Sequence, residues 1–310
     1  MITPEQANPE YAELTVAGRQ IFESMCALLK RAGLEYQGHF LDLSGRRIHY
    51  LDYGEGPTVL LLHGGGAGSA IWFRQIEVLS KTHRVIAPDH PVFGLSEQVA
   101  FEKPLVQSMM TYLTEFIDAL GLDEFDVVGL SMGAQGALGL AINSPERIKK
   151  LAVIGSAGLG KSFPLVFKLA TVPLLGRLIL RPNRWGQDNY FKTMEVVDSK
   201  FDDAPVYRQY AFDVTTSEGH VGAMQASLRA ITTLAGQREI FSDSELMSIS
   251  APTLAVWGEH DKLFPADHRA RLARLVPNAT LHIVESAAHV PLLDHPDLVN
   301  ELLAGFLGSD

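Results

Sequence analysis

Gly129-Leu130-Ser131-Met132-Gly133 is the stretch of sequence that decides the fold. It ends the apolar run Phe125–Leu130, which is typical of a buried strand, and a helical pattern begins at Met132. A serine on a sharp strand-to-helix turn has a strained backbone, and small residues two positions on either side of it prevent clashes. Such a turn lifts the Ser131 hydroxyl above the sheet and points a helix N-terminus towards it. The pattern predicts a nucleophilic serine.

Apolar runs on both sides of this stretch predict a mostly parallel sheet. The strand candidates are His39–Leu43, Ile48–Tyr53, Thr58–His63, Arg84–Pro88, Phe125–Leu130, Lys150–Gly155, Thr253–Gly258 and Thr280–Glu285, of which the first two form a hairpin. The helical candidates between them are Ala70–Ser80, Leu105–Leu120, Met132–Asn143, Ala266–Leu275 and Pro296–Leu307. This alternation predicts the α/β class, with helices on both faces of the sheet.

The N-terminal segment has a different pattern. Residues Pro9–Arg31 are amphipathic, with Leu14, Ile21 and Leu28 spaced by seven, and Gly33 is a stop signal. We expect residues 1–35 to form a helical extension that packs on the main domain. The alternatives are a helix that mediates a homodimer or one that lies on a membrane surface.

Residues 161–239 also interrupt the alternation, because no strand-like run fits there. The segment is expected to be a helical cap, inserted into a core made of residues 36–160 and 240–310. Its apolar start, Phe163–Leu180, contains Lys168, Pro173 and Arg177, so we do not expect it to span a membrane.

The composition argues against a nucleic-acid partner. The 310 residues carry a formal net charge of −10 without a dense run of Lys and Arg, which argues against nucleic acid.

The single cysteine, Cys26, allows no intrachain disulfide, and the first residues lack the pattern of a secretion signal. Cytoplasmic localisation is therefore expected, and removal of a leader from a precursor is left open. Clusters of metal ligands do not appear, so we expect neither a metal nor an organic cofactor.

A glycine-rich stretch, His63-Gly64-Gly65-Gly66, follows the strand candidate Thr58–His63. Glycines let a loop approach a reacting carbonyl so that a backbone N–H can stabilise its oxyanion. The N–H groups of Gly65 and of Met132 are the predicted donors. His63 itself is expected to hold the loop in place.

A serine nucleophile needs a base and a carboxylate that orients it. His289 follows the last predicted strand, at the sheet edge where open α/β folds bind ligands. Asp261 follows the preceding strand, Thr253–Gly258, at the same edge. We predict a triad of Ser131, Asp261 and His289, with Glu259 as the competing carboxylate.

The chain resembles the α/β-hydrolase superfamily from about His39 to Leu307. The matching motifs are His63-Gly64-Gly65-Gly66, Pro88-Asp89-His90-Pro91-Val92-Phe93-Gly94-Leu95-Ser96, Gly129-Leu130-Ser131-Met132-Gly133, Gly258–Pro265 and Ala288-His289-Val290-Pro291. The resemblance implies the α/β-hydrolase fold with a cap and the chain order Ser, Asp, His. Val92 and Ala134 depart from the family, which usually has glycine there.

The choice of reaction rests on few residues. Haloalkane dehalogenases and epoxide hydrolases look similar but carry Asp as nucleophile, so Ser131 argues against them. The glycine loop is similar to that of meta-cleavage-product hydrolases, which cut C–C bonds, carry a cap arginine and generally have an aromatic residue after the histidine. This chain has Val290 there, and Arg177, Arg181 and Arg184 are the candidate arginines.

The expected function is therefore that of a carboxylesterase, which acts through an acyl-enzyme on a small-molecule ester. C–C bond hydrolysis is the alternative, and a small-molecule receptor with slow turnover is a second one.

Overall fold

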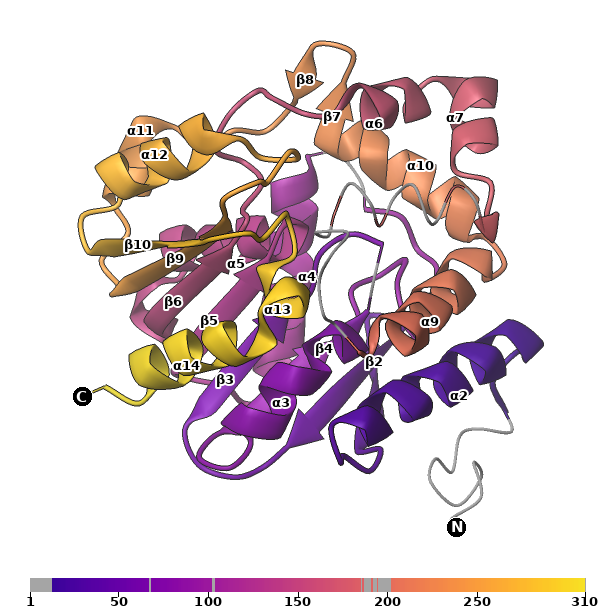
Figure 1. Ribbon diagram of the computed structural model, residues 1–310, viewed down its shortest axis with the longest axis horizontal. Helices are drawn as coiled ribbons and strands as arrows, with labels where there is room; N and C mark the ends of the chain where they lie inside the picture. Colours follow the sequence, from indigo (N-terminus) through magenta and orange to yellow (C-terminus); the bar gives the residue numbers. More distant parts are fainter. Residues whose placement is uncertain are drawn as a thin grey trace.

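An eight-stranded sheet forms the centre of the molecule (Figure 1). The computed structural model describes residues 13–66, 68–101, 104–184, 186, 191, 194 and 202–309. The strands of the sheet are β1 (Gly38–Leu43), β2 (Arg46–Tyr53), β3 (Thr58–Leu62), β4 (Arg84–Pro88), β5 (Phe125–Leu130), β6 (Ile148–Ile154), β9 (Thr253–Gly258) and β10 (Ala279–Val284). Their spatial order is β1-β2-β4-β3-β5-β6-β9-β10.

The sheet is mostly parallel, as predicted. Strands β1, β2 and β4 pair antiparallel, and each later neighbour pairs parallel. All residues of the central strand β5 and of β9 are buried, because helices cover both faces. The parallel strands end at one edge, and the segments that follow β5, β9 and β10 therefore meet there.

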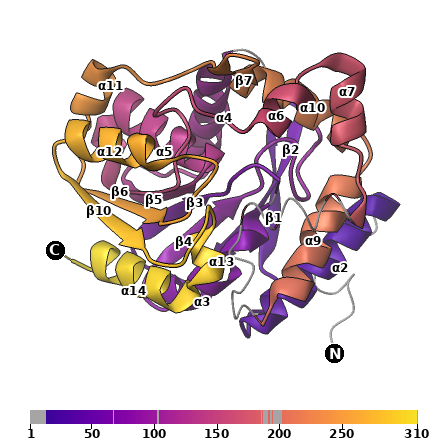
Figure 2. The same ribbon diagram turned by 45° about the horizontal axis from the view of Figure 1, so that its top comes forward.

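Helices lie on both sides of the sheet, as expected for the α/β-hydrolase fold (Figures 1 and 2). The predicted ones are found as α3 (Phe73–Leu79), α4 (Leu105–Ala119), α5 (Met132–Asn143), α12 (Ala266–Leu275) and α14 (Pro296–Leu307). A 3-10 turn, η2 (Ser69–Trp72), forms the start of the first of these. Helix α3 packs against α14 on one face, and α4 packs against α5 on the other.

Three short helical elements were not predicted from the sequence. They are η3 (Pro145–Arg147), α11 (Asp243–Met247) and α13 (Pro291–Asp294). None is long enough to show the 3.6-residue periodicity by which a helix is recognised. A hairpin of two-residue strands, β7 (Thr232–Thr233) and β8 (Gly236–Gln237), likewise contradicts the expectation that residues 161–239 contain no strand, because such strands show no alternation.

The N-terminal helix α2 (Val16–Arg31) starts later than predicted. Thr15 accepts a hydrogen bond from the N–H of Gly18 at 3.0 Å and thereby caps the helix, so residues 13–15 lie outside it. The predicted residues 9–12 lie outside the described part of the chain. Gly33 ends the helix with a φ of 69°, as expected for a glycine stop.

Residues 161–239, between β6 and β9 in the sequence, are called the insert below. It contains α6 (Leu165–Ala170), α7 (Pro173–Ile179), α9 (Ala204–Thr216), α10 (His220–Ile231) and the short hairpin. Helix α9 lies alongside α2 (Figure 2). Asp203, at the start of α9, is 1% exposed at its side chain and forms ion pairs with Arg31 of α2 and Arg74 of α3. One carboxylate therefore joins the insert, the N-terminal helix and the core.

Candidate active site

Ser131 lies on the sharp turn that the sequence predicts, between β5 and α5. Its φ of 56° and ψ of −112° are unusual for a residue with a side chain, and this is the strained backbone expected there. The glycines beside it are required by space. A Cβ on Gly129 would lie 2.5 Å from the Cα of Ala134, and one on Gly133 would lie 2.1 Å from the carbonyl oxygen of Leu62.

His289 and Asp261 form a buried pair at the same sheet edge. The Nδ1 of His289 lies 2.9 Å from Oδ2 of Asp261, and both side chains are 1% exposed. The other carboxylate oxygen accepts hydrogen bonds from the N–H groups of Leu263 and Phe264, at 2.8 and 3.0 Å. The Nε2 of His289 is buried and has no hydrogen-bond partner among the described residues. The carboxylate therefore holds the ring and leaves one nitrogen for another group.

The competing carboxylate, Glu259, is placed elsewhere. Its Oε2 accepts a hydrogen bond from the N–H of Ser286 at 3.1 Å, and its side chain is 47% exposed. The structure thus brings Asp261, and not Glu259, to His289.

Gly155 is a residue of the site that the sequence analysis missed. It follows β6 with a φ of 52°, and a Cβ there would lie 3.1 Å from Nδ1 of His289 and 3.3 Å from Oδ2 of Asp261. A side chain at this position would displace the pair. The signal in the sequence was a glycine directly after a buried strand, but its importance depends on two residues more than 100 positions away.

The glycine loop lies over the nucleophile turn. A Cβ on Gly64 would lie 3.1 Å from that of Ser131, whereas one on Gly65 would meet no atom within 4 Å. Met132 is the first residue of α5, where a backbone N–H has no partner four residues earlier in the helix. The two predicted oxyanion donors thus border Ser131.

His63 anchors this loop, as expected. Its Nδ1 donates to the carbonyl of Gly64 at 2.7 Å, and its Nε2 accepts from the N–H of His90 at 2.9 Å. Complete burial lowers the pKa of His63, although the nearby Asp89 acts in the opposite direction. The ring is therefore neutral and serves as a structural link between two loops.

Three adjoining cavities lie around Ser131. The first, of about 20 Å³, is lined by Ser131, His289 and both Gly64 and Gly65. The second, of about 60 Å³, is lined by Ser131, Gln135 and Ser227 and otherwise mostly by apolar side chains from the core and the insert. These include Phe93, Phe163, Phe167, Met224, Leu228 and Phe264.

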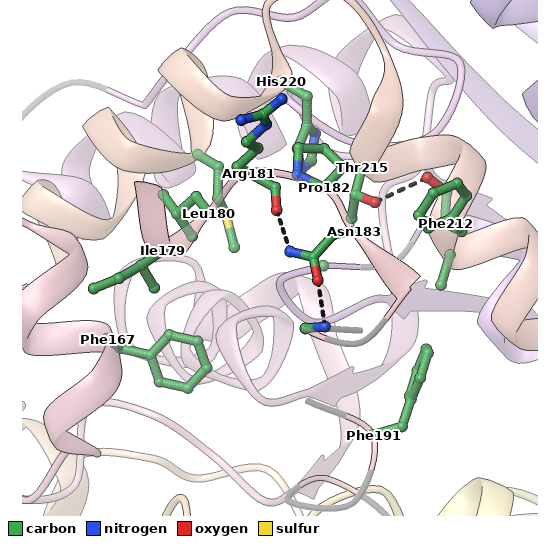
Figure 3. Close-up of a pocket in the computed structure, with 14 residues that line it drawn as sticks. Phe167, Ile179, Leu180, Arg181, Pro182, Asn183, Phe191, Phe212, Thr215 and His220 are labelled. Carbon is green, nitrogen blue, oxygen red and sulfur yellow. Dashed lines mark hydrogen bonds between the residues drawn. The ribbon is translucent and has the colours of Figure 1, made fainter. Parts of the chain in front are cut away.

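The third cavity, of about 140 Å³, is lined by Gly66 and by residues of the insert (Figure 3). It shares Phe191 with the first cavity, and Phe167 and Met224 with the second. Among the described residues that line the three cavities, Arg181 is the only Arg, Lys, Asp or Glu. Of the three candidate arginines, the structure therefore brings this one, and neither Arg177 nor Arg184, to these three cavities.

Asn183 fixes the segment that carries Arg181. Its side-chain amide donates to the carbonyl of Arg181 at 2.9 Å and accepts from the N–H of Gly186 at 2.7 Å (Figure 3). His220 lines the same cavity, and burial lowers its pKa to about 4. It is neutral near pH 7, so Arg181 supplies the positive charge.

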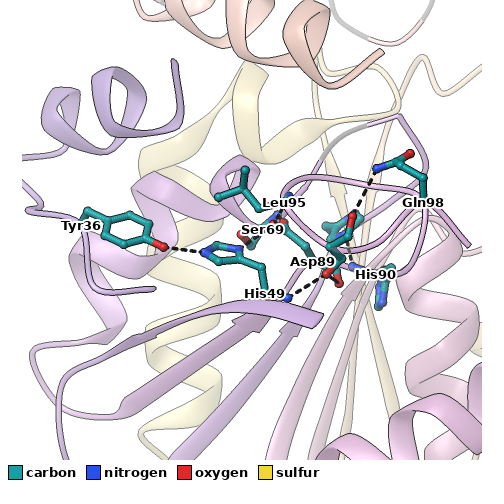
Figure 4. A network of polar contacts seen from close by, with 9 residues as sticks. Tyr36, His49, Ser69, Asp89, His90, Leu95 and Gln98 are labelled. Atoms are coloured by element: carbon teal, nitrogen blue, oxygen red, sulfur yellow. Dashed lines mark hydrogen bonds and ion pairs between the residues drawn. The ribbon is translucent and has the colours of Figure 1, made fainter. Parts of the chain in front are cut away.

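A second His–Asp pair lies under the loop after β4 (Figure 4). Nδ1 of His49 is 2.7 Å from Oδ2 of Asp89, and the hydroxyl of Tyr36 is 3.0 Å from Nε2 of His49. Asp89 also accepts hydrogen bonds from the N–H groups of Ser69 and Leu95. Burial alone would raise the pKa of Asp89, but the charge and hydrogen bond of His49 hold it below its usual value.

Val92, one of the two departures from the family pattern, lies in this loop. Its φ is 83°, in the left-handed region that favours glycine, and its side chain is fully buried. Its carbonyl accepts a hydrogen bond from Nδ1 of His220 at 3.2 Å, so the strained residue also contacts the insert.

Two kinds of site are absent from the part of the chain that the structure describes. No three His, Cys, Asp or Glu side chains come together there as metal ligands would. None of its helices is long and apolar enough to cross a membrane.

Comparisons with known proteins identify the family of this chain. The family described as alpha/beta hydrolase fold matches residues 57–296. The chain is 31% identical, over 86% of its length and 93% of the relative's, to 2-hydroxy-6-oxo-6-phenylhexa-2,4-dienoate hydrolase of Burkholderia cepacia. It is 32% identical, over 84% and 91%, to 2-hydroxy-6-oxononadienedioate/2-hydroxy-6-oxononatrienedioate hydrolase 2 of Pseudomonas putida.

Among solved structures, carboxylesterase CesB from Bacillus subtilis superimposes with a TM-score of 0.79 at 26% identity, covering 96% of this chain and all of the other. The family match, the relatives and the serine turn lead to one conclusion: the chain belongs to the α/β-hydrolase family and is a serine hydrolase.

Proposed function

We propose that this hydrolase cleaves a carbon–carbon bond next to the ketone of a conjugated keto acid, as meta-cleavage-product hydrolases do. The observation that carries the proposal is the similarity to the relatives from Burkholderia cepacia and Pseudomonas putida. Their names describe substrates with a ketone, conjugated double bonds and a carboxylate. The sequence alone favoured ester hydrolysis, and the comparisons reverse that order.

In the proposed mechanism, Ser131 attacks the ketone carbon. His289 accepts its proton through Nε2, and Asp261 stabilises the charged ring through Nδ1. The N–H groups of Gly65 and Met132 donate to the oxyanion, a contribution of about 10²–10³ in rate for each donor. Collapse of the tetrahedral intermediate breaks the C–C bond and leaves the acyl group on Ser131, and the protonated Nε2 of His289 gives its proton to the departing carbon, which returns the ring to its neutral form. Water then releases the acid, with His289 as the base.

Cleavage of a C–C bond differs from ester cleavage in the leaving group. An alkoxide leaves as an oxygen anion, whereas a carbon leaving group needs its electron pair delocalised and its carbon protonated. A conjugated carboxylate end can take up that charge if a cation holds it. Arg181 is the one cation that the described lining residues supply, so we assign it to the substrate carboxylate.

The insert acts as the cap in this proposal. Its residues form most of the wall of the 140 Å³ cavity and part of the wall of the apolar one. A substrate bound against this mostly apolar wall would displace water and so strengthen the interaction between Arg181 and a carboxylate. The acyl part of the substrate would occupy the apolar cavity beside Ser131.

Ester hydrolysis is the second candidate function, and two observations favour it. Val290 follows His289 and lines the cavity at Ser131, where meta-cleavage-product hydrolases generally have an aromatic residue. The carboxylesterase CesB also covers nearly the whole chain. An aliphatic ester needs no cation at the leaving group.

The two candidates are separated by a direct comparison of substrates. Purified protein is given 2-hydroxy-6-oxo-6-phenylhexa-2,4-dienoate and, separately, p-nitrophenyl butyrate, and kcat/KM is measured for each. We expect a higher kcat/KM for the dienoate. Arg181→Gln should lower kcat/KM for the dienoate by about 10²-fold and affect the neutral ester far less, because a charge-assisted hydrogen bond is lost only with the anion.

Arg184→Gln is the matched control. Arg184 comes from the same segment, but its guanidinium donates to Gln209 at 2.8 Å and stacks over Phe212. Turnover of the ester without turnover of the dienoate would refute C–C hydrolysis and leave the esterase. Failure of both substrates, together with tight binding of either, would point to the receptor function.

A further inference from the structure

The helices α6 and α7 of the insert expose large apolar side chains. Leu174 is 82% exposed, Leu178 is 69% exposed and Leu165 is 67% exposed. Together with Val166 and Leu175 they are called the leucine surface below. Leu174, Leu175 and Leu178 share one face of α7, because positions i and i+4 lie one above the other on a helix. Both figures of the whole molecule place α7 at its outer margin (Figures 1 and 2).

The same two helices form part of the wall of the 140 Å³ cavity near Ser131. Phe167 of α6 and Ile179 of α7 line it, as does Leu180 directly after α7. These side chains are half-buried, in contrast to the leucine surface. The helices therefore have apolar side chains both on the cavity side and on the solvent side, and only a thin layer separates the two.

The charge around the leucine surface differs from that of the rest of the chain. Residues 161–184 contain Lys161, Lys168, Arg177, Arg181 and Arg184 and no Asp or Glu. Helix α10, which contacts both α6 and α7, also contains no acidic residue. The chain as a whole has a net charge of −10, so the positive charge is local to this region.

We propose that the leucine surface binds to anionic lipid bilayers, with the surrounding basic residues against the lipid headgroups. Exposed leucines beside Lys and Arg are the composition of segments that lie in the membrane interface. Basic residues near an anionic surface each increase binding about fivefold at moderate salt. A substrate whose apolar part partitions into the bilayer would then lie close to the helices that line the cavity. The inference does not depend on which bond the enzyme cleaves.

Charge favours a lipid surface over a second copy of the chain as the occupant. Two leucine surfaces facing each other across a twofold axis would bring Arg177 and its basic neighbours together. Like charges in an interface are unfavourable, and they are not neutralised by any acidic residue of α6, α7 or α10.

The experiment is co-sedimentation of the full chain with vesicles of phosphatidylcholine alone and with vesicles of equimolar phosphatidylcholine and phosphatidylglycerol. We expect binding to the mixed vesicles at about 0.02 M salt, and much weaker binding to neutral vesicles or at about 0.5 M salt. The double variant Leu174→Ser/Leu178→Ser should lower the partition coefficient at least about tenfold. Arg177→Gln should lower it about fivefold.

Met247→Ser is the matched control, because Met247 is 60% exposed on α11, far from α7 in Figure 1. It should bind as the wild type does. Equal thermal melting of all variants shows that each one is folded. Wild-type protein that fails to bind the mixed vesicles, or a double variant that binds them equally well, would overturn the proposal. A dimer in light scattering that the double variant dissociates, without vesicle binding, would instead assign the leucine surface to contacts between copies.

Discussion

Two buried His–Asp pairs, His289–Asp261 and His49–Asp89, can be compared within this one molecule. Their Nδ1–Oδ2 distances are 2.9 and 2.7 Å, and their side chains are at most 1% exposed. In both, the carboxylate also accepts two backbone N–H bonds. The pairs are alike at Nδ1 and differ at Nε2.

The Nε2 of His49 is bonded to the hydroxyl of Tyr36, deep under a loop. The Nε2 of His289 has no partner among the described residues, and its ring lines a cavity together with Ser131. A His–Asp pair is therefore not in itself a sign of catalysis. The surroundings of Nε2 decide whether such a pair can catalyse a reaction, because general base catalysis needs a nitrogen that a reacting proton can reach.

The largest effect is expected from removing the nucleophile or the base. Ser131→Ala and His289→Ala should each lower kcat by about 10⁵–10⁶, and Ser131→Ala should change stability little. Labelling with a serine-reactive fluorophosphonate, followed by mass spectrometry, checks the first variant. Labelling that persists in Ser131→Ala would show that another residue is the nucleophile.

The carboxylates of the two pairs, Asp261 and Asp89, should also differ: the first in its effect on catalysis, the second in its effect on stability. Asp261→Asn should lower kcat by about 10⁴, because an amide no longer fixes the tautomer with the proton on Nδ1. Asp89→Asn should lower the melting temperature and leave the kcat of folded protein unchanged within about twofold. Steady-state kinetics and thermal melting of both variants test this contrast between an effect on turnover and an effect on stability. A large loss of kcat in Asp89→Asn would remove the distinction between the two pairs.

The sequence was informative where function depends on local geometry. Ser131, Asp261 and His289 each lie within five residues of the end of a strand, so their common sheet edge could be inferred from chain order alone. Gly155 and the His49–Asp89 pair could not be found in this way, because their contacts join residues distant in the sequence. The choice of Arg181 among three arginines likewise depends on how short helices of the insert pack, and periodicity does not encode that packing.

His49→Gln should cost stability and spare catalysis. The substitution leaves the carboxylate of Asp89 buried without its partner, a loss of about 3–5 kcal/mol in the free energy of unfolding. Urea unfolding measures the loss, and active-site titration of the remaining folded protein gives its kcat. A stability equal to that of the wild type would mean that the pair contributes no net energy.

His220 provides a third case, a buried histidine with a backbone carbonyl in place of a carboxylate. Burial lowers its pKa to about 4, from about 6.5 in an unfolded chain. Between these values only the unfolded state binds the proton, so the free energy of unfolding falls as the pH falls, by up to about 3 kcal/mol for this group. Urea unfolding at several pH values should show a shallower decline for His220→Gln than for the wild type. Identical slopes of the free energy of unfolding against pH in the two proteins would contradict the lowered pKa of His220.

The smallest effect is expected at Tyr36. Tyr36→Phe removes the hydroxyl bonded to Nε2 of His49 and should cost about 1 kcal/mol of stability, with unchanged turnover. The urea midpoint measures the cost. A gain of hydrolytic activity in Ser131→Ala/Tyr36→Phe over Ser131→Ala would show that the freed nitrogen can act as a base after all.

The ion pairs of Asp203 have a consequence for how the protein is made. Arg31 and Asp203 are 172 residues apart, and helix α2 packs along α9, which begins directly after Asp203. During synthesis at about 5–20 residues per second, α2 leaves the ribosome about 10–30 s before its partner exists. Helix α2 therefore lacks this partner helix for that time. The first helix that the structure describes is therefore among the last to complete its packing.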